Sequence, residues 1–400
     1  MCEALKKVFC KALFSINFLL FLSLGSNASA NDLPSDSVSQ EAHQQASEVT
    51  ETASTAHAEG SHDEGFDPGH MITEHISDSH DWHLWGHTHI PLPVILYTSK
   101  GMEVFSSANF RNHETHGLQD YKGSNGIIYR LEDEKVKIVS DSGAIDELAS
   151  SALIDFSITK NVLTIFIVSA LLLFIFFSVA KAYGKRQGKA PSGLQSFLEP
   201  IIIFIRDDVA KPSIGSKYER FMPYLLTVFF FIWIANLLGL VPVIPGGANM
   251  TGNIAVTLTL AVLTFLITTV NGNKHYWGHI FAMPGVPKGI LLLLTPIEIL
   301  GVFLRPFVLM IRLFANISAG HIIALAFFSL IFIFGEGGKS IGAGFGVGIV
   351  SWLFTVFMMA LELLVAFLQA FVFTLLSAIY FGAAVEDSHH EEHEHSPHTS

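Results

Sequence analysis

The sequence predicts an all-α polytopic membrane protein with about five transmembrane passages. The last two passages form a long, strongly tilted helical hairpin, and a partly disordered outer segment with a small β-rich module precedes the helices. Of the 400 residues, 50% are hydrophobic and only 14% are charged, against roughly 25% charged in soluble domains. Residues 31–150 hold 21 acidic and 6 basic side chains, whereas residues 151–400 hold 13 and 14 in mostly apolar sequence. This composition argues against a soluble enzyme, and the acidic soluble part argues against nucleic acid as a partner.

The first thirty residues have the pattern of a cleavable signal peptide. Three lysines up to Lys11 precede an apolar run over residues 18–24, and the small-residue triplet 28–30 ends at Ala30. The run is much shorter than the ~20 residues that a membrane span requires. Both cysteines of the chain lie in this segment, so we expect neither a disulfide nor a cysteine metal site.

Residues 31–150 form an acidic, histidine-rich segment that we place outside the cytoplasm. Its first part, residues 31–89, is predicted to be disordered because it has too few large apolar residues to offset chain entropy. Short β-type runs separated by turn residues predict a small β-rich module over residues 90–150. Eleven of the 19 histidines lie in residues 31–150 and five more in the His- and Glu-rich tail, residues 386–400. Such histidines can capture metal ions weakly, but no ligand spacing recurs, which favours a solvated polar stretch and no metal site.

The membrane domain is predicted to span residues 151–385. Residues 161–180 carry no charge and suit one crossing, and the basic residues that follow between 181 and 189 place that end in the cytoplasm. The pattern over 195–210 suits an amphipathic helix at the membrane surface. An uncharged stretch over 221–273, broken by a Pro- and Gly-containing turn, predicts two further crossings. The N-terminus of the mature chain is therefore expected outside the cytoplasm.

Two long apolar stretches follow, over residues 290–334 and 345–385, with a Gly-rich turn between them. Each would extend about 60 Å as a helix, roughly twice the ~30 Å thickness of the hydrocarbon layer. These helices must therefore tilt strongly or bend. Five passages that begin outside leave the C-terminus in the cytoplasm.

Five ionisable residues interrupt these two stretches, and each costs at least ~2.5 kcal/mol in a membrane. They are Glu298, Arg305, Arg312, His321 and Glu362. Arg305, beside a proline, fits a structural or interfacial role. Arg312 has apolar neighbours on both sides and indicates a functional position.

A register argument places these residues relative to one another. In an antiparallel hairpin, facing residues have position numbers with a nearly constant sum. Arg312 with Gln369 and His321 with Glu362 give nearly the same sum, so one hairpin can pair both at two depths. Asn316 shares a helix face with Arg312, and Glu298 lies about 21 Å before Arg312 on nearly that face.

The segment that contains Arg312 resembles the signature of subunit a of F-type ATP synthases. The resemblance covers about residues 150–385 and rests on three stretches, Arg312-Leu-Phe-Ala-Asn-Ile-Ser-Ala-Gly-His321, Leu368-Gln-Ala-Phe-Val-Phe373 with Ile379-Tyr380, and Phe229 through Pro242. Many bacterial members have an acid where this chain has His321 and a histidine where it has Glu362, an exchange that keeps one acid and one base together. The His-rich outer segment departs from the usual short N-terminus.

The resemblance implies a non-catalytic, proton-translocating subunit without a cofactor in a bacterial inner membrane. It implies that Arg312 is the essential stator arginine facing a ring of c subunits. Two aqueous half-channels are then lined or bordered by Glu298, Asn316, His321, Glu362 and Gln369, with Asn253 at a polar channel position. The implied partners are the c-ring, the b subunits of the peripheral stalk and the remaining F1Fo subunits. H⁺ and Na⁺ both remain open as the coupling ion, because the ion-binding carboxylate is on another chain.

Two other classes of function are weighed against this one. A metal-ion transporter with a His-rich collecting domain requires pairs of metal ligands on its membrane helices. Of the 19 histidines, only His321 lies deep in a predicted span. A receptor or assembly protein anchored by its spans leaves the aligned intramembrane charges without a purpose. Copurification of ring and stalk subunits, or of bound zinc, distinguishes these classes.

Overall fold

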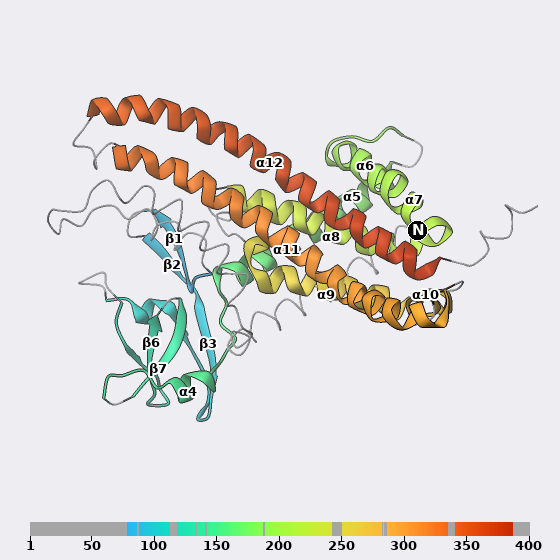
Figure 1. The fold of residues 1–400 in the computed structure, drawn as a ribbon. Helices are drawn as coiled ribbons and strands as arrows, with labels where there is room; N and C mark the ends of the chain where they lie inside the picture. Colours follow the sequence, from blue (N-terminus) through green and yellow to red (C-terminus); the bar gives the residue numbers. More distant parts are fainter. Residues whose placement is uncertain are drawn as a thin grey trace, which may run out of the picture. The chain divides into compact units, whose positions relative to one another are not determined.

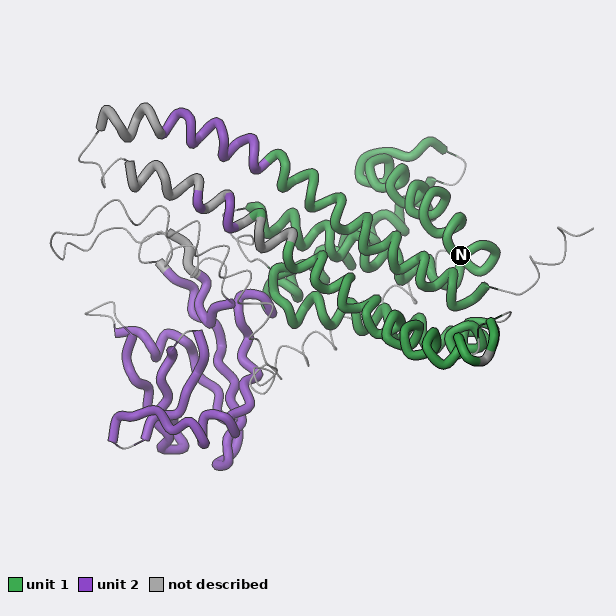
Figure 2. Tube along the Cα trace, in the orientation of Figure 1, with its two compact units in different colours: residues 1–21, 163–320, 360–400 green, residues 22–162, 321–359 purple. Residues whose placement is uncertain are grey.

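The computed structural model describes residues 78–85, 88–112, 118–132, 134–140, 142–186, 189–241, 250–281, 283, 286–334 and 341–386. The predicted signal peptide, most of the predicted disordered segment, the turn at 335–340 and nearly all of the tail lie outside these residues. The chain divides into two compact units (Figure 2). Of the described residues, 163–320 and 360–386 belong to the first, helical unit. The second unit, residues 22–162 and 321–359, contains the strands and also parts of helices α11 and α12. We call the strand-bearing part, up to Thr159, the outer unit, and the helices from Lys160 onward the membrane unit.

The outer unit contains three small antiparallel sheets (Figure 1). The first pairs β1 (Asp81–Trp85) with β2 (Thr88–Pro91). The second has the order β4-β3-β8, and the third has the order β5-β6-β7. The bounds of these strands are β3 Pro93–Thr98, β4 Gly101–Ser106, β5 Tyr121–Lys122, β6 Ile128–Glu132, β7 Lys135–Val139 and β8 Ile154–Asp155. A short helical turn η2 (Ser107–Phe110) and helix α4 (Glu147–Ser151) complete the module.

The predicted limits of the β-rich module, residues 90–150, are too narrow at both ends. Strand β1 already begins at Asp81, inside the segment predicted to be disordered, and β8 lies at Ile154–Asp155. The reason is packing rather than local pattern. Buried Trp82 belongs to a histidine-rich run, and β8 is only two residues long, so it becomes a strand only by pairing with β3.

The core of the outer unit is formed by every second side chain along its strands. Val94, Leu96, Phe105, Phe110 and Tyr129 are all buried in one cluster. Successive strand residues point to opposite faces, so every second side chain of β3 and β4 enters this core.

The outer unit is hydrogen-bonded to the start of the first membrane helix. The carboxylate of Asp78 accepts hydrogen bonds from Thr159 Oγ1 (2.9 Å) and from the main-chain N–H of Asn161 (3.1 Å). The buried His80 Nε2 lies 3.2 Å from Asp155 Oδ2. Burial alone lowers the pKa of His80, but the hydrogen bond with Asp155 and the charges of Asp155 and Asp78 outweigh it and raise that pKa. Burial opposes ionisation of Asp155 as well, yet His80 brings the pKa of Asp155 below its usual value.

The membrane unit is built from helices. These are α5 (Lys160–Lys185), α6 (Leu194–Phe204), the π-helical turn η3 (Ile205–Ala210), α7 (Lys211–Ile214), the 3-10 turn η4 (Gly215–Lys217), α8 (Tyr218–Leu240), the 3-10 turn η5 (Met250–Gly252), α9 (Ile254–Val270), α10 (Lys274–Phe281), α11 (Lys288–Phe334) and α12 (Ile341–Val385). Four of the described helical stretches are long and apolar enough to cross a membrane, or up to five if the bent pair α9 and α10 forms one span. The predicted polytopic all-α membrane fold is confirmed.

The core of the membrane unit centres on α8 and the second half of α12. Phe221 through Ile232 on α8 are buried without interruption. On α12, the small residues Ala366, Ala370, Thr374 and Ala378 recur every fourth position, and all are buried. Small residues at this spacing let two helix backbones approach closely in a membrane.

The two long helices match the predicted apolar stretches. Helix α11 has 47 residues and α12 has 45, so each is far longer than an upright crossing needs. The two prolines of α11, Pro296 and Pro306, lie inside the helix. The N–H of Asn273 donates to the carbonyl of Ala384 (2.8 Å), which ties the end of α12 to the loop before α10.

Candidate functional site

Arg312 lies on an exposed, otherwise apolar face of α11. Leu309 and Leu313 are buried on the inner side of the helix, whereas Val308, Ile311 and Arg312 are exposed. Among the described residues, no carboxylate lies within ion-pair distance of the Arg312 side chain. An isolated cation on an apolar membrane face needs a partner from outside this chain or from water.

Gln369 of α12 holds α11 at the level of Arg312. Its Nε2 donates a hydrogen bond to the main-chain oxygen of Arg312 over 2.6 Å. The Gln369 side chain is only 4% exposed, between the buried Ala366 and Ala370. The predicted pairing of Arg312 with Gln369 is confirmed at the level of this contact.

Glu362 lies one level further along the hairpin, against Gly320. A Cβ added to Gly320 would come 2.8 Å from Glu362 Oε1, so the carboxylate occupies the space that glycine leaves open. Glu362 is half-buried, and its Oε1 is buried without a hydrogen-bond partner among the described residues. Such an acceptor favours a proton or a donor from outside the described groups. The contact is one residue from His321, the partner that the register predicts.

The other predicted site residues are placed as follows. Asn316 and His321 lie in α11, and their side chains are outside the described residues. Glu298 is half-buried in α11, 14 positions before Arg312. Asn253 is the N-cap of α9, and its Oδ1 accepts a hydrogen bond from the N–H of Ala255 (2.9 Å). Its side chain therefore has a structural task that the sequence reasoning did not foresee.

A polar connection between α8, η5 and α12 was not predicted. Thr251 Oγ1 donates to Asn236 Oδ1 (2.6 Å), and Asn236 Nδ2 donates to the carbonyl of Ala366 (3.3 Å). All three residues are buried, and Ala366 is three positions from Gln369. The signal in the sequence was an asparagine in an aromatic and aliphatic run, which is costly in a membrane unless its amide is paired.

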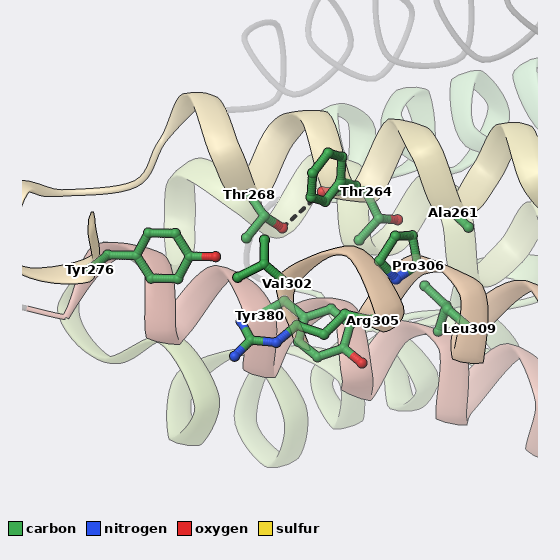
Figure 3. A pocket seen from close by; sticks show the side chains of 10 residues that line it. Ala261, Thr264, Thr268, Tyr276, Val302, Arg305, Pro306, Leu309 and Tyr380 are labelled. Carbon is green, nitrogen blue, oxygen red and sulfur yellow. Dashed lines mark hydrogen bonds between the residues drawn. The ribbon is translucent and has the colours of Figure 1, made fainter. Parts of the chain in front are cut away.

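Arg305 lines a pocket between α9, α10, α11 and α12 (Figure 3). Its guanidinium carbon lies 5.6 Å from the ring centre of Tyr380, and its Nη1 is buried without a hydrogen-bond partner among the described residues. Tyr276 lines the same pocket, whose empty space of about 260 Å³ is partly open to the surroundings. The structural role expected for Arg305 agrees with this cation–π contact.

Metal ligation finds no support in the described part of the chain. No group of three or more His, Cys, Asp or Glu side chains there could hold a metal ion.

Comparisons with known proteins agree with the arrangement of the membrane unit. The family model described as ATP synthase A chain matches residues 162–382. A second family model, described as a domain of unknown function (DUF8433), matches residues 71–156, which include the strands of the outer unit.

Similar proteins carry the name ATP synthase subunit a. The protein from Pelodictyon phaeoclathratiforme is 43% identical over 288 residues, which cover 70% of this chain and 81% of the relative. The one from Chloroherpeton thalassium is 44% identical over 249 residues, 61% of this chain and 72% of the relative. ATP synthase subunit a 2 of Chlorobaculum tepidum is 48% identical over 248 residues, 60% and 67%. With the family model matching residues 162–382 and these identities, the chain belongs to the ATP synthase subunit a family.

Proposed function

We propose that this chain is the stator subunit that couples transmembrane proton flow to rotation of a c-subunit ring through two aqueous half-channels. The observation that carries the proposal is Arg312, an exposed cation on an apolar helix face that Gln369 fixes from behind. Arginine stays protonated in proteins, so it attracts a deprotonated ring carboxylate and blocks direct proton passage between the half-channels.

The polar groups on either side of Arg312 define the two half-channels. Glu362, whose buried Oε1 has no hydrogen-bond partner among the described residues, and His321 receive protons from the outer side and pass them to a ring carboxylate. After almost a full turn of the ring, the proton leaves near Glu298, about 21 Å along α11. A histidine exchanges protons near neutral pH, which suits the outer half-channel. Asn316, on the Arg312 face, borders the path, and Asn253 belongs to the preceding helix.

The c-ring docks against the exposed face of the long helices. On α11 the exposed side chains that share or border the face of Arg312 are Leu304, Val308 and Ile311, and on α12 Leu361 and Leu364 are exposed. A broad apolar face in the membrane accepts either lipid or another apolar helix surface, and Arg312 selects a partner with a carboxylate. The b subunits of the peripheral stalk and the other F1Fo subunits complete the assembly.

The orientation follows from the basic residues at the end of α5. Lys181, Lys185 and Arg186 place that end in the cytoplasm, so the outer unit is periplasmic and the C-terminus cytoplasmic in a bacterial inner membrane. The outer segment from Asn31 to about His80 is not required for proton passage itself, because its composition suggests disorder and about 70 residues separate it from the spans.

The test is ATP-driven proton pumping by the purified complex, with and without sodium. Arg312→Ala should abolish pumping while the complex still assembles, because the arginine acts through its charge and alanine fits a helix. Arg312→Lys should also fail, because an ammonium lacks the planar guanidinium. The control Lys185→Ala, at the exposed end of α5, should pump normally. Normal coupled pumping by either Arg312 variant contradicts the proposal, and sodium-dependent pumping identifies Na⁺ as the ion.

A second test asks whether His321 and Glu362 act as one unit. His321→Glu and Glu362→His each create a like pair and should slow pumping strongly. The double exchange restores one acid and one base and should recover a substantial part of the rate. A double-variant loss equal to the sum of the single losses would show independent sites.

A further inference from the structure

One sheet of the outer unit carries apolar side chains on both faces. In the sheet β4-β3-β8, Val94, Leu96 and Phe105 point into the core. Side chains alternate along a strand, so the intervening residues form the opposite face. Antiparallel sheets with one solvated face usually carry polar residues there, whereas this face is mainly apolar, with the polar Ser106 at the end of β4.

The residues of this opposite face lie next to one another by register. Ile95 pairs with Val104, and Tyr97 pairs with Met102 on one side and Ile154 on the other. Tyr97, Met102, Val104 and Ile154 are 53%, 72%, 58% and 41% exposed. We call these five residues the outer apolar face.

The outer apolar face contains no charge, although residues 31–150 as a whole are strongly acidic. The two acidic residues of these strands are engaged away from it. Glu103 is buried on the core side, where it accepts hydrogen bonds from Ser124 and Tyr129. Asp155 pairs with His80. A contiguous exposed apolar patch of this kind marks a binding surface on a protein or a membrane.

The sheet continues into the first membrane helix without a flexible linker. The N–H groups of Phe156 and Ile158 donate to the carbonyls of Ile95 (2.8 Å) and Pro93 (3.1 Å), which extends the pairing of β3 beyond β8. Together with the Asp78 hydrogen bonds to Thr159 and Asn161, these bonds fix the strand to the start of α5. Ile154 is six residues before Lys160, so it lies within about 20 Å of the helix start.

We propose that the outer apolar face rests on the outer leaflet of the bilayer, with lipid as its occupant. The backbone holds Ile154 within about 20 Å of Lys160, the first residue of α5, and Tyr97 and Met102 are paired next to Ile154, so a lipid surface at the start of this helix lies within reach of the face. Tyrosine prefers the membrane interface, because its ring is apolar and its hydroxyl remains hydrated. The absence of charge on the face removes the main cost of approaching lipid. A second copy of the chain or another protein could bind the face only by entering the space next to the bilayer, which lipid already borders.

The test measures collision rates of nitroxide labels in the assembled complex in lipid nanodiscs. A single cysteine is placed at Val104 or at Met102, with Cys2 and Cys10 replaced by Ser, and each is labelled. The control label is at Lys135, an exposed residue of β7 outside the outer apolar face. Oxygen concentrates in lipid and a nickel chelate remains in water. Each labelled complex must first pump protons at the rate of the unlabelled one.

Lipid contact predicts that labels at Val104 and Met102 collide several-fold less with the nickel chelate than the Lys135 label does, and more with oxygen. Low collision rates with both reagents would show that protein covers the face, and would overturn the proposal. Rates with both reagents equal to those at Lys135 would show a water-exposed face, and would overturn it equally.

Discussion

Gly320 leaves the space in which the Glu362 carboxylate lies, so replacing it by alanine tests the outer half-channel without removing an ionisable group. The added Cβ would lie 2.8 Å from Glu362 Oε1 and 3.4 Å from its Cγ. A shift of about 0.5 Å restores an ordinary contact, and the side chain provides it by leaving its rotamer well. Displacement of this size costs about 0.5–1.5 kcal/mol. At about 1.36 kcal/mol per tenfold, the carboxylate would hold its present position about 2- to 13-fold less often, and proton pumping should slow by a similar factor.

The matched control is Gly289→Ala in the same helix, where an added Cβ meets nothing within 4 Å. Both changes replace a helical glycine by alanine. The gain in helix propensity is larger at Gly320, in the helix interior, than at Gly289, the second residue of α11, but such a gain favours the helix and does not account for slower pumping by Gly320→Ala. ATP-driven pumping by reconstituted complexes, normalised to the amount of assembled subunit, is the measurement.

A second variant, Glu362→Asp, tests whether contact with Glu362 causes the slower pumping by Gly320→Ala. Glu362→Asp shortens the side chain by one methylene and withdraws the carboxylate from residue 320. The effect of Gly320→Ala should therefore shrink in that background, whereas unrelated effects would add. Equal pumping by Gly320→Ala and Gly289→Ala, or an undiminished effect in the Glu362→Asp background, would refute the assigned contact.

Three further predictions concern stability. Because the pKa of His80 is raised above 6.5 and that of Asp155 lowered below 3.8, their ion pair stabilises the outer unit fully between these values and loses its effect as pH rises through the pKa of folded His80. Hydrogen-exchange protection factors of the paired strands, which are corrected for the intrinsic rise of the exchange rate with pH, should therefore fall at alkaline pH, and His80→Gln should remove this dependence. Gly382→Ala would drive a Cβ into a main-chain oxygen of α7 and should lower the amount of assembled subunit on a native gel, whereas Gly184→Ala, in open space, should not. Asn253→Ala removes the cap of α9 and should cost about 1 kcal/mol in the thermal stability of the complex; if Asn253→Asp, which caps equally well, loses pumping, the residue also serves the channel.

The fold class, the long hairpin and the register of Arg312 with Gln369 follow from the sequence by itself. Hydrophobic length, the position of charges and helical periodicity are local properties, and the membrane allows few ways to satisfy the backbone. A helical hairpin then fixes facing residues by counting alone. For this reason the side chain of Gln369 could be assigned to the level of Arg312 from the residue numbers.

Other features were decided only by tertiary packing. Strand β8 exists because β3 provides its partner, and the role of Asn253 as a cap depends on where α9 begins. No local pattern indicates that Gly320 accommodates Glu362, because the space that a glycine leaves has value only when a facing helix fills it. The polar link from Thr251 through Asn236 to Ala366 joins three elements far apart in the chain. Periodicity within one helix shows which face is buried, but only the assembled bundle determines which polar atoms meet there.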